Sequence, residues 1–250
     1  SGWRPSLGTH YERTDITNEI NQNIRIDARM TGPIKTDEEV WGISYLTERQ
    51  RIADVEINNR QALIGVYTYT RRRVDSLIAP QRGYVASIEL SGGPRGILNQ
   101  ANIARVYGRA NWLSPTVKRW QAVARTQVGQ VFGASRELVP SALLFRTGGD
   151  QSVRGYSFNS LGVEQSGAVV GGRILAIVSA ELVYHLTPAW GAAIFHDAGN
   201  AADSWRDFHF KQGSGVGARW NTPVGRVNLD LAYAHATHQP HLHFSLGYGF

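Results

Sequence analysis

Residues 226–250 read RVNLDLAYAHATHQPHLHFSLGYGF, and apolar side chains recur at every second position over most of this stretch. In the last ten residues one set is Leu242, Phe244, Leu246, Tyr248 and Phe250, and the set between them is His241, His243, Ser245, Gly247 and Gly249. Successive side chains of a β-strand point to opposite faces, so a period of two predicts strands with one apolar and one polar face. The stretch therefore predicts two such strands joined by a hairpin.

The same alternation recurs through the chain, for example from Trp120 to Val128 and from Ile174 to Tyr184. We predict strands at about 2–13, 24–30, 37–50, 59–72, 82–93, 100–113, 120–128, 173–184, 188–199, 215–220, 226–233 and 241–250. Seven of these segments precede a long connector at about 133–168, and five follow it. Leu175 and Ile177 break the pattern, because they place apolar side chains on an otherwise polar face.

The composition limits the classes of protein to be considered. A chain of 250 residues is long enough for one all-β domain, and the absence of cysteine excludes a disulfide framework. A transmembrane helix needs about 20 consecutive apolar residues, and no segment approaches that length. The net charge is +6, but the arginines are scattered at alternate positions, so the charge does not indicate nucleic-acid binding. No signal peptide is visible before Ser1, and we expect the natural amino terminus to lie elsewhere.

The polar face of the predicted strands distinguishes a membrane barrel from a water-soluble sandwich. It is rich in Arg, Gly, Ser, Asn and Gln rather than Lys and Glu, which favours a narrow polar lumen. The connectors alternate in length: short ones contain Pro115, Pro188 and Pro223, and long ones span about 133–168 and 200–212. Outer-membrane barrels have short periplasmic turns and longer outer loops. We therefore predict a single antiparallel transmembrane β-barrel domain over residues 1–250, located in the outer membrane of a Gram-negative bacterium.

The segment Gly148-Gly-Asp-Gln-Ser-Val-Arg-Gly-Tyr156 lies in the longest part of the chain without strand-like alternation. Its single arginine, Arg154, precedes Gly155 and follows a pair of glycines by a few residues. Two interpretations are open from the residues alone. Arg154 is either an exposed turn residue or part of an outer loop that folds back into the lumen.

Four segments carry a resemblance to a known family. They are Gly149-Asp-Gln-Ser-Val-Arg-Gly-Tyr156, Phe195-His-Asp-Ala-Gly199, Pro80-Gln-Arg-Gly-Tyr84 after Arg71-Arg-Arg-Val-Asp75, and the terminal Gly247-Tyr-Gly-Phe250. In this order they resemble the outer-membrane insertase and translocase superfamily of BamA and TamA. The TamA branch and the translocator barrels of patatin-type autotransporters are the nearest members. The resemblance spans nearly the whole chain.

The resemblance implies roles for particular residues. The loop-lock motif would be Val153, Arg154, Gly155 and Tyr156, and the residues that receive it would be Glu181, Phe195, Asp197 and Gly199. The C-terminal β-signal would be Phe244, Leu246, Gly247, Tyr248 and Phe250. Alternation independently places Phe195, Asp197 and Gly199 on one inward face and Glu181 on the inward face of its own strand. A guanidinium between two carboxylates would form charge-assisted hydrogen bonds.

Family barrels have sixteen strands that follow periplasmic POTRA domains, whereas about twelve strands are predicted here. The five strands after the long connector match the family, and the earlier set is four short. We therefore expect the C-terminal part of a larger protein, without its POTRA domains and first strands. A natural barrel with fewer strands is the alternative.

The resemblance also implies a function, namely helping to insert or secrete polypeptides across the outer membrane. The expected partners are outer-membrane lipid, unfolded or β-rich polypeptide clients, and periplasmic or inner-membrane assembly proteins that would act through POTRA domains. Autotransporter assembly fits this class of clients. No cofactor, catalytic residue or metal is expected. The first alternative is the C-terminal translocator barrel of a patatin-type lipolytic autotransporter.

The second alternative is an outer-membrane pore or an enzyme with a site at the barrel rim. His235, His238, His241 and His243 cluster near Asp230 in the last hairpin. No motif places a nucleophile or a water-activating pair among them. Alternation sends only His241 and His243 to one face, so a metal site is not expected.

Overall fold

A computed structural model describes residues 2–16, 19–33, 36–52, 55–76, 80–96, 98–222 and 225–247. Twelve strands form one antiparallel sheet. They are β1 (Arg4–Ile16), β2 (Glu19–Thr31), β3 (Asp37–Ile52), β4 (Val55–Val74), β5 (Gly83–Gly93), β6 (Ile103–Leu113), β7 (Trp120–Phe132), β10 (Ile174–His185), β11 (Trp190–Ala202), β12 (Lys211–Thr222), β13 (Gly225–Ala234) and β14 (Gln239–Leu246). The prediction of an all-β fold with seven strands before the long connector and five after it is confirmed.

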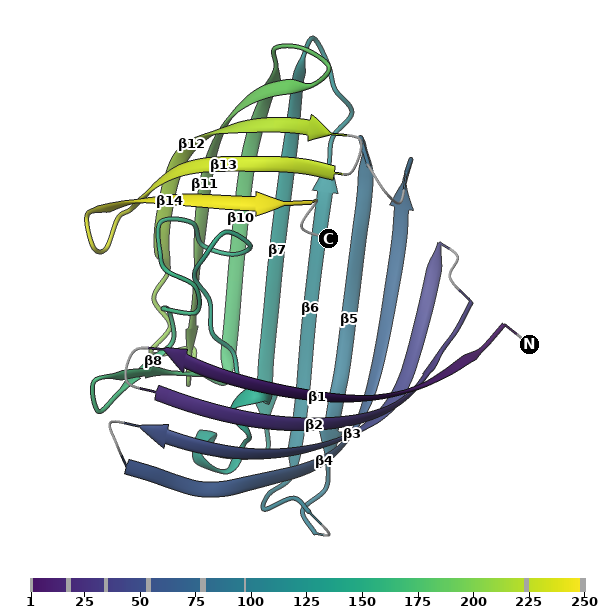
Figure 1. Ribbon diagram of the computed structural model, residues 1–250, viewed down its shortest axis with the longest axis vertical. Helices are drawn as coiled ribbons and strands as arrows, with labels where there is room; N and C mark the ends of the chain where they lie inside the picture. The colour runs from purple at the N-terminus through teal and green to yellow at the C-terminus, as the bar shows by residue number, and fades with distance from the viewer. Residues whose placement is uncertain are drawn as a thin grey trace.

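The sheet is strongly curved, and each strand pairs with its neighbours in the chain. In Figure 1, β1–β4 and β12–β14 curve to the front below and above, while β5–β7 and β10 form the back wall. β1 and β14 are the two ends of the sheet, and within the described ranges no strand pairing joins them. The wall is therefore that of a barrel that remains open between its first and last strands.

One connector is shorter than predicted. The second long connector was expected at about 200–212, but it covers only residues 203–210. The difference arises because β11 continues to pair with β10 as far as Ala202, opposite Ile174. The alternation of side chains stops before the backbone pairing does, so sequence periodicity underestimates the length of these strands.

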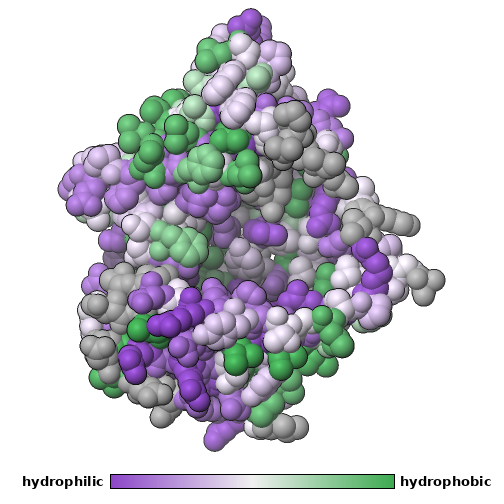
Figure 2. Space-filling model, in the orientation of Figure 1, coloured by the Kyte–Doolittle hydropathy of each residue, from purple (hydrophilic) through white to green (hydrophobic). Residues whose placement is uncertain are grey.

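The two faces of the sheet differ as the alternation predicts. On β13, Leu229, Leu231 and Tyr233 are exposed on the outer face, whereas Asp230 and Ala232 are buried on the inner face. Figure 2 shows hydrophobic side chains over the C-terminal strands and polar ones around the central hollow. Exposed apolar side chains on the outer face of a sheet whose neighbouring strands pair along their backbones suit contact with lipid. Within the described ranges, no helix is long and apolar enough to cross a membrane.

Residues 133–173, here called the lumenal loop, lie on the concave side of the sheet (Figure 1). The loop contains two 3-10 turns, η1 (Arg136–Leu138) and η2 (Ser141–Leu143), and a hairpin of β8 (Val163–Gln165) and β9 (Ala168–Val170). Its buried Phe145 and Val153 share one apolar cluster with Leu175 and Ile177 of β10. The two apolar residues that broke the polar face of β10 therefore pack against the loop rather than face water.

Candidate functional site

The centre of the site is Arg154, which lies at the tip of the lumenal loop and is only 2% exposed. Its Nε donates to Oδ2 of Asp197 at 2.7 Å, and its Nη2 donates to Oδ1 at 3.0 Å. The backbone N–H of Arg154 also donates to Oδ2 of Asp197, at 3.1 Å. The pair is thus bidentate, the arrangement in which a planar guanidinium binds a carboxylate most strongly.

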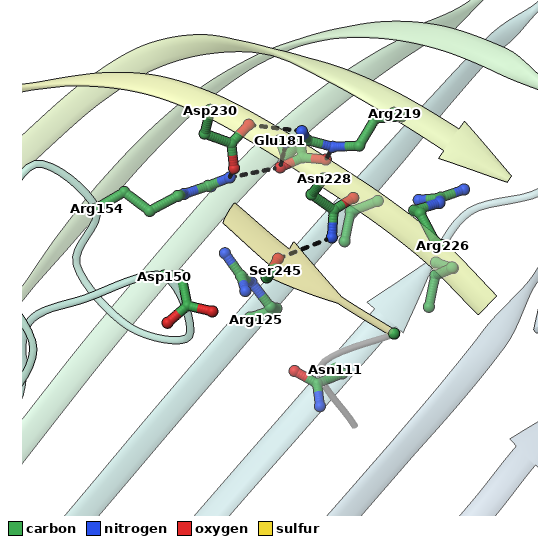
Figure 3. A pocket seen from close by; sticks show the side chains of 13 residues that line it. Asn111, Arg125, Asp150, Arg154, Glu181, Arg219, Arg226, Asn228, Asp230 and Ser245 are labelled. Carbon is green, nitrogen blue, oxygen red and sulfur yellow. Dashed lines mark hydrogen bonds and ion pairs between the residues drawn. The ribbon is translucent and has the colours of Figure 1, made fainter. Parts of the chain in front are cut away.

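Two more carboxylates and a second arginine extend this ion pair. Nη1 of Arg154 donates to Oε2 of Glu181 at 2.8 Å and to Oδ2 of Asp230 at 3.1 Å. Arg219 holds the same two carboxylates from the other side, with Nη2–Oε2 of 2.7 Å to Glu181 and Nη1–Oδ1 of 2.5 Å to Asp230. In Figure 3, the side chains of Arg154 and Arg219 converge on the carboxylates of Glu181 and Asp230. Opposite charges therefore alternate through the network, which lowers the cost of burying each one.

The register of β10 and β11 explains how the acceptors come together. Glu181 pairs with Phe195, and Ser179 pairs with Asp197. These four residues occupy inward positions on adjacent strands, because side chains two residues apart share a face. The ring of Phe195 lies 3.4 Å from Cζ of Arg154, so the guanidinium also makes a cation–π contact.

The three carboxylates around Arg154 stabilise its charged form. Burial by itself lowers the pKa of the guanidinium, but the hydrogen bonds and charge of Asp197, followed by those of Glu181 and Asp230, raise the pKa above its ordinary value. The side chain therefore stays charged. Removing Asp197 would take away the bidentate partner of this buried charge, and breaking a buried pair costs ~3–5 kcal/mol.

The loop tip at Arg154 and Gly155 comes close to the backbone of β12 and β13, with no room for a side chain between them. A Cβ on Gly213 of β12 would lie 1.9 Å from the carbonyl oxygen of Arg154. Gly155 has φ +97°, and a Cβ there would lie 2.9 Å from the backbone nitrogen of Ala234. Both positions therefore require glycine for the tip to dock.

The rest of the tip is held by β12 to β14. The N–H of Gly155 donates to Nε2 of His243 at 2.8 Å, and the hydroxyl of Tyr156 donates to the carbonyl of Gln212 at 3.0 Å. Val153 is fully buried in the apolar cluster, and its methyl group would touch any Cβ at Gly199. Val153 and Arg154 thus contact β10 and β11, which carry the expected acceptors. Gly155 and Tyr156 contact β12–β14 instead, which the sequence did not assign to this motif.

A second anchor holds the start of the loop to the N-terminal strands. The N–H of Ser141 donates to Oε2 of Glu48 on β3 at 2.7 Å, and Nη1 of Arg60 on β4 donates to the carbonyl of Val139 at 3.2 Å. Nδ2 of Asn21 on β2 donates to the Ser141 hydroxyl. The loop therefore spans the lumen, with its start on β2–β4 and its tip on β10–β14.

The whole chain, residues 1–250, matches the description "Omp85 superfamily domain". It belongs to the Omp85 superfamily. The expected resemblance to the BamA-type insertases and translocases is confirmed at the level of the family, and the chain is accordingly a β-barrel protein of the bacterial outer membrane with an insertase or translocator fold.

Solved structures agree with this assignment. BamA from Haemophilus ducreyi lacking POTRA domains 1–3 is similar with a TM-score of 0.79 and 15% identity, over 97% of this chain and 58% of that one. CdiB from Acinetobacter baumannii is similar with a TM-score of 0.56 and 14% identity, over 90% of this chain and 41% of that one. At these identities the likeness concerns the fold. This Omp85 chain spans less than two thirds of either structure.

The histidines and Asp230 that suggested an enzyme site at the rim do not lie together in the structure. Asp230 and His243 face the lumen of the Omp85 wall, where they bind Arg154 and Gly155. His235 lies on the outer face, where Ser214 Oγ is 3.0 Å from its Nε2 and 2.8 Å from Nδ1 of His196. His238 contacts the Tyr233 hydroxyl at 3.0 Å. The cluster seen in the sequence is thus divided between two faces of the wall.

Sequence reasoning missed several residues of the ion-pair network around Arg154. Ser179 and Arg219 were not among the residues that the motifs singled out, and Asp230 was assigned to the rim-enzyme hypothesis. All three occupy inward positions, but only the strand register shows that Ser179 and Asp230 reach Arg154 and that Arg219 reaches the carboxylates around it. The anchor formed by Glu48 and Arg60 carries no motif and was not anticipated.

Two further motifs of the Omp85 chain can be placed in part. Phe244 and Leu246 of the expected β-signal point outward and are exposed, while Tyr248 and Phe250 lie outside the described residues. In the turn before β5, the carboxylate of Asp75 accepts the N–H of Gln81 at 2.9 Å. Burial raises the pKa of Asp75, but the N–H groups of Gln81 and Arg82 together lower this pKa below the usual value.

Proposed function

We propose that this Omp85 chain helps polypeptides to insert into or cross the outer membrane by adding a client strand at the edge of β14. The observation that carries the proposal is the open end of the sheet. β14 pairs with β13 along one edge, and within the described ranges no strand pairs with its other edge. An unpaired edge presents a row of backbone donors and acceptors to any extended chain, which is the basis of β-strand addition.

The filled lumen supports a route along the sheet edge rather than through the middle. The lumenal loop buries an apolar cluster inside the wall and is fixed at both ends of the sheet. The polar cavity beside the lock, lined among others by Asn111, Arg125 and Ser245, has a volume of about 60 Å³, which suits a few water molecules. Two larger hollows, of about 380 and 280 Å³, lie against the start of the loop, and the loop crosses the lumen between them and the lock. A passive pore is accordingly the weaker proposal.

The proposed activity requires no catalytic residue, because strand exchange replaces hydrogen bonds and breaks no covalent bond. In this proposal the loop lock fixes β10–β13 as a rigid wall, and β14 is the part that a client meets. We further propose that additional strands lie next to β1 in the intact protein, and that the pairing of the first of them with β14 is weak enough to open for a client strand. The client in this proposal is defined by its chemistry alone, as an extended polypeptide that forms β-strands.

Disulfide trapping tests the proposal, because the chain contains no cysteine. Leu246→Cys places a thiol on β14, and Val128→Cys places one on the same outward face of β7, which is paired on both sides. Single cysteines are scanned along the terminal strand of a stalled β-rich client. We expect cross-links to Leu246→Cys at one register of the client strand and none to Val128→Cys. Equal cross-linking at both sites, or none at β14, would refute strand addition at this edge.

A further inference from the structure

The outer face of the wall is hollowed near the rim that carries the short turns. Tyr184 of β10 pairs with Ala192 of β11, Ala192 pairs with Ala218 of β12, and Ala218 pairs with Leu229 of β13. These residues form one row across four strands on the outward face. The two alanines in the middle of the row leave a depression between larger neighbours, here called the alanine groove.

Large side chains wall the alanine groove on every side. Toward the rim, the rings of Trp190 and Trp220 stack at 5.4 Å with an interplanar angle of 4°. At one end, Trp120 packs against Tyr184 with a centroid distance of 4.8 Å. On the side away from the rim, the next row contributes Ile194 and Val216. The hollow has a volume of about 630 Å³ and an almost entirely apolar lining.

The rim beside the groove is positively charged. Lys118 and Arg119 are exposed in the turn directly before Trp120. The carbonyl of Arg119 accepts the N–H of His185 at 2.8 Å, which fixes this turn against β10 next to the groove. Residues 114–122, 183–196 and 216–229 contain no Asp or Glu. The two cations therefore have no acidic neighbour along the chain segments that border the groove.

We propose that the alanine groove binds one acyl chain of an anionic glycerophospholipid, with the headgroup phosphate held by Lys118 and Arg119. An apolar hollow that opens beside cations and aromatic rings fits a ligand with an acyl chain and an anionic head. Trp and Tyr concentrate at membrane interfaces, and Lys and Arg near the surface attract anionic lipid. Short turns face the periplasm in barrels of this type, so the groove lies in the phospholipid leaflet.

Native mass spectrometry of the intact protein in detergent tests the proposal, with phosphatidylglycerol and phosphatidylcholine of identical acyl chains as the probes. We expect one phosphatidylglycerol to be retained in preference to phosphatidylcholine. Ala192→Phe combined with Ala218→Phe fills the groove and should abolish retention of both lipids. Lys118→Asn combined with Arg119→Asn should weaken phosphatidylglycerol binding roughly 30-fold, the effect of two cations near an anionic lipid. Asparagine is used because both residues have positive φ, 49° and 74°.

Matched variants control for charge and bulk. Ala28→Phe adds the same ring to the outward face of β2, and Arg206→Asn with Lys211→Asn removes two cations at the opposite rim. Both controls should bind lipid like the parent. If the controls lose lipid as much as the groove variants do, or if the groove variants keep the lipid, the lipid adheres to the outer face in general and the site is refuted. Heat-modifiable migration on unboiled gels confirms that each variant is folded.

Discussion

At the scale of single residues, Arg154 depends on Asp197 more than on its other partners. Asp197 accepts hydrogen bonds from Nε, Nη2 and the backbone N–H of Arg154, whereas Glu181 and Asp230 share Nη1. Glu181 and Asp230 also have Arg219 as a second cation. Loss of Asp197 therefore leaves the guanidinium less well compensated than loss of either other carboxylate.

We expect Arg154→Ala and Asp197→Ala to keep the strand content but to loosen the barrel. Each variant removes one side of the buried bidentate pair, and breaking such a pair costs ~3–5 kcal/mol. The loss should appear as disappearance of heat-modifiable migration on unboiled gels, with unchanged circular dichroism. Asp150→Ala is the control, since Asp150 lies on the same loop and its side chain accepts from Gln151. Migration of both variants like the parent would exclude a stabilising lock.

Gly213→Ala should weaken the lock without touching a charged group. The added methyl group would overlap the carbonyl oxygen of Arg154, so the tip must withdraw from β12. We expect the same gel phenotype as for Arg154→Ala, and faster hydrogen exchange of residues 150–156. Gly8→Ala on β1 is the matched control, because its Cβ would meet no atom within 4 Å. A parent-like Gly213→Ala would show that the tip does not need this close approach.

Several of these residues could be predicted from the sequence, because the signal for each lies in a short segment around it. Arg154, Phe195 and Asp197 belong to short motifs, and alternation alone places Phe195 and Asp197 on the same face. Arg219 and Asp230 could not be assigned to the surroundings of Arg154. The contact of Asp230 with Arg154, and of Arg219 with Asp230, depends on the register of strands more than sixty residues away in the chain. Periodicity gives the face of a side chain but not its height along the barrel.

At the scale of elements, the lumenal loop links the two ends of the sheet. Its start is tied to β2–β4 through Ser141 and Val139, and its tip is tied to β10–β14 through Arg154 and Gly155. β9 lies against β2 and packs with Ile52 of β3. A displacement of the loop would therefore break contacts with both the first and the last strands.

Glu48→Ala should release the start of the loop while leaving the tip docked. It removes the acceptor of the Ser141 N–H and the carboxylate beside Arg60, and an unsatisfied buried group costs ~1–3 kcal/mol. We expect faster tryptic cleavage after Arg136 and Arg146 in the folded protein, with unchanged heat-modifiable migration. Glu164→Ala, an exposed change on β8, should cleave like the parent. Unchanged cleavage in Glu48→Ala would mean that the anchor does not hold the loop.

The strands were predictable as elements because lipid on one side and a polar lumen on the other impose strict alternation. The interior of the loop was not predictable in this way. η1, η2 and the β8–β9 hairpin pack inside the lumen, where their neighbours come from every part of the wall and impose no period. In the sequence, only the two apolar residues of β10 that interrupt the alternation, Leu175 and Ile177, indicated that something packs inside the barrel.

At the scale of the whole molecule, the described part of the Omp85 chain combines a lumen crossed by a loop with a sheet edge at β14 that no described strand covers. The outward face is apolar and suits lipid, and the inward face is occupied by the loop and its ion pairs. Open edges are normally protected in β proteins, because they recruit other strands. Here the open edge and the filled lumen together favour strand addition at β14 over passage through the middle.

Reconstitution of the intact protein in liposomes tests this account most directly. A β-rich client is added outside, and two signals are recorded together: folding of the client into a protease-resistant form and release of a trapped small dye. The account predicts faster client folding than in empty liposomes, little release of dye, and loss of the acceleration in Asp197→Ala. Release of dye by the folded protein without any acceleration of client folding would contradict it and identify the barrel as a passive pore.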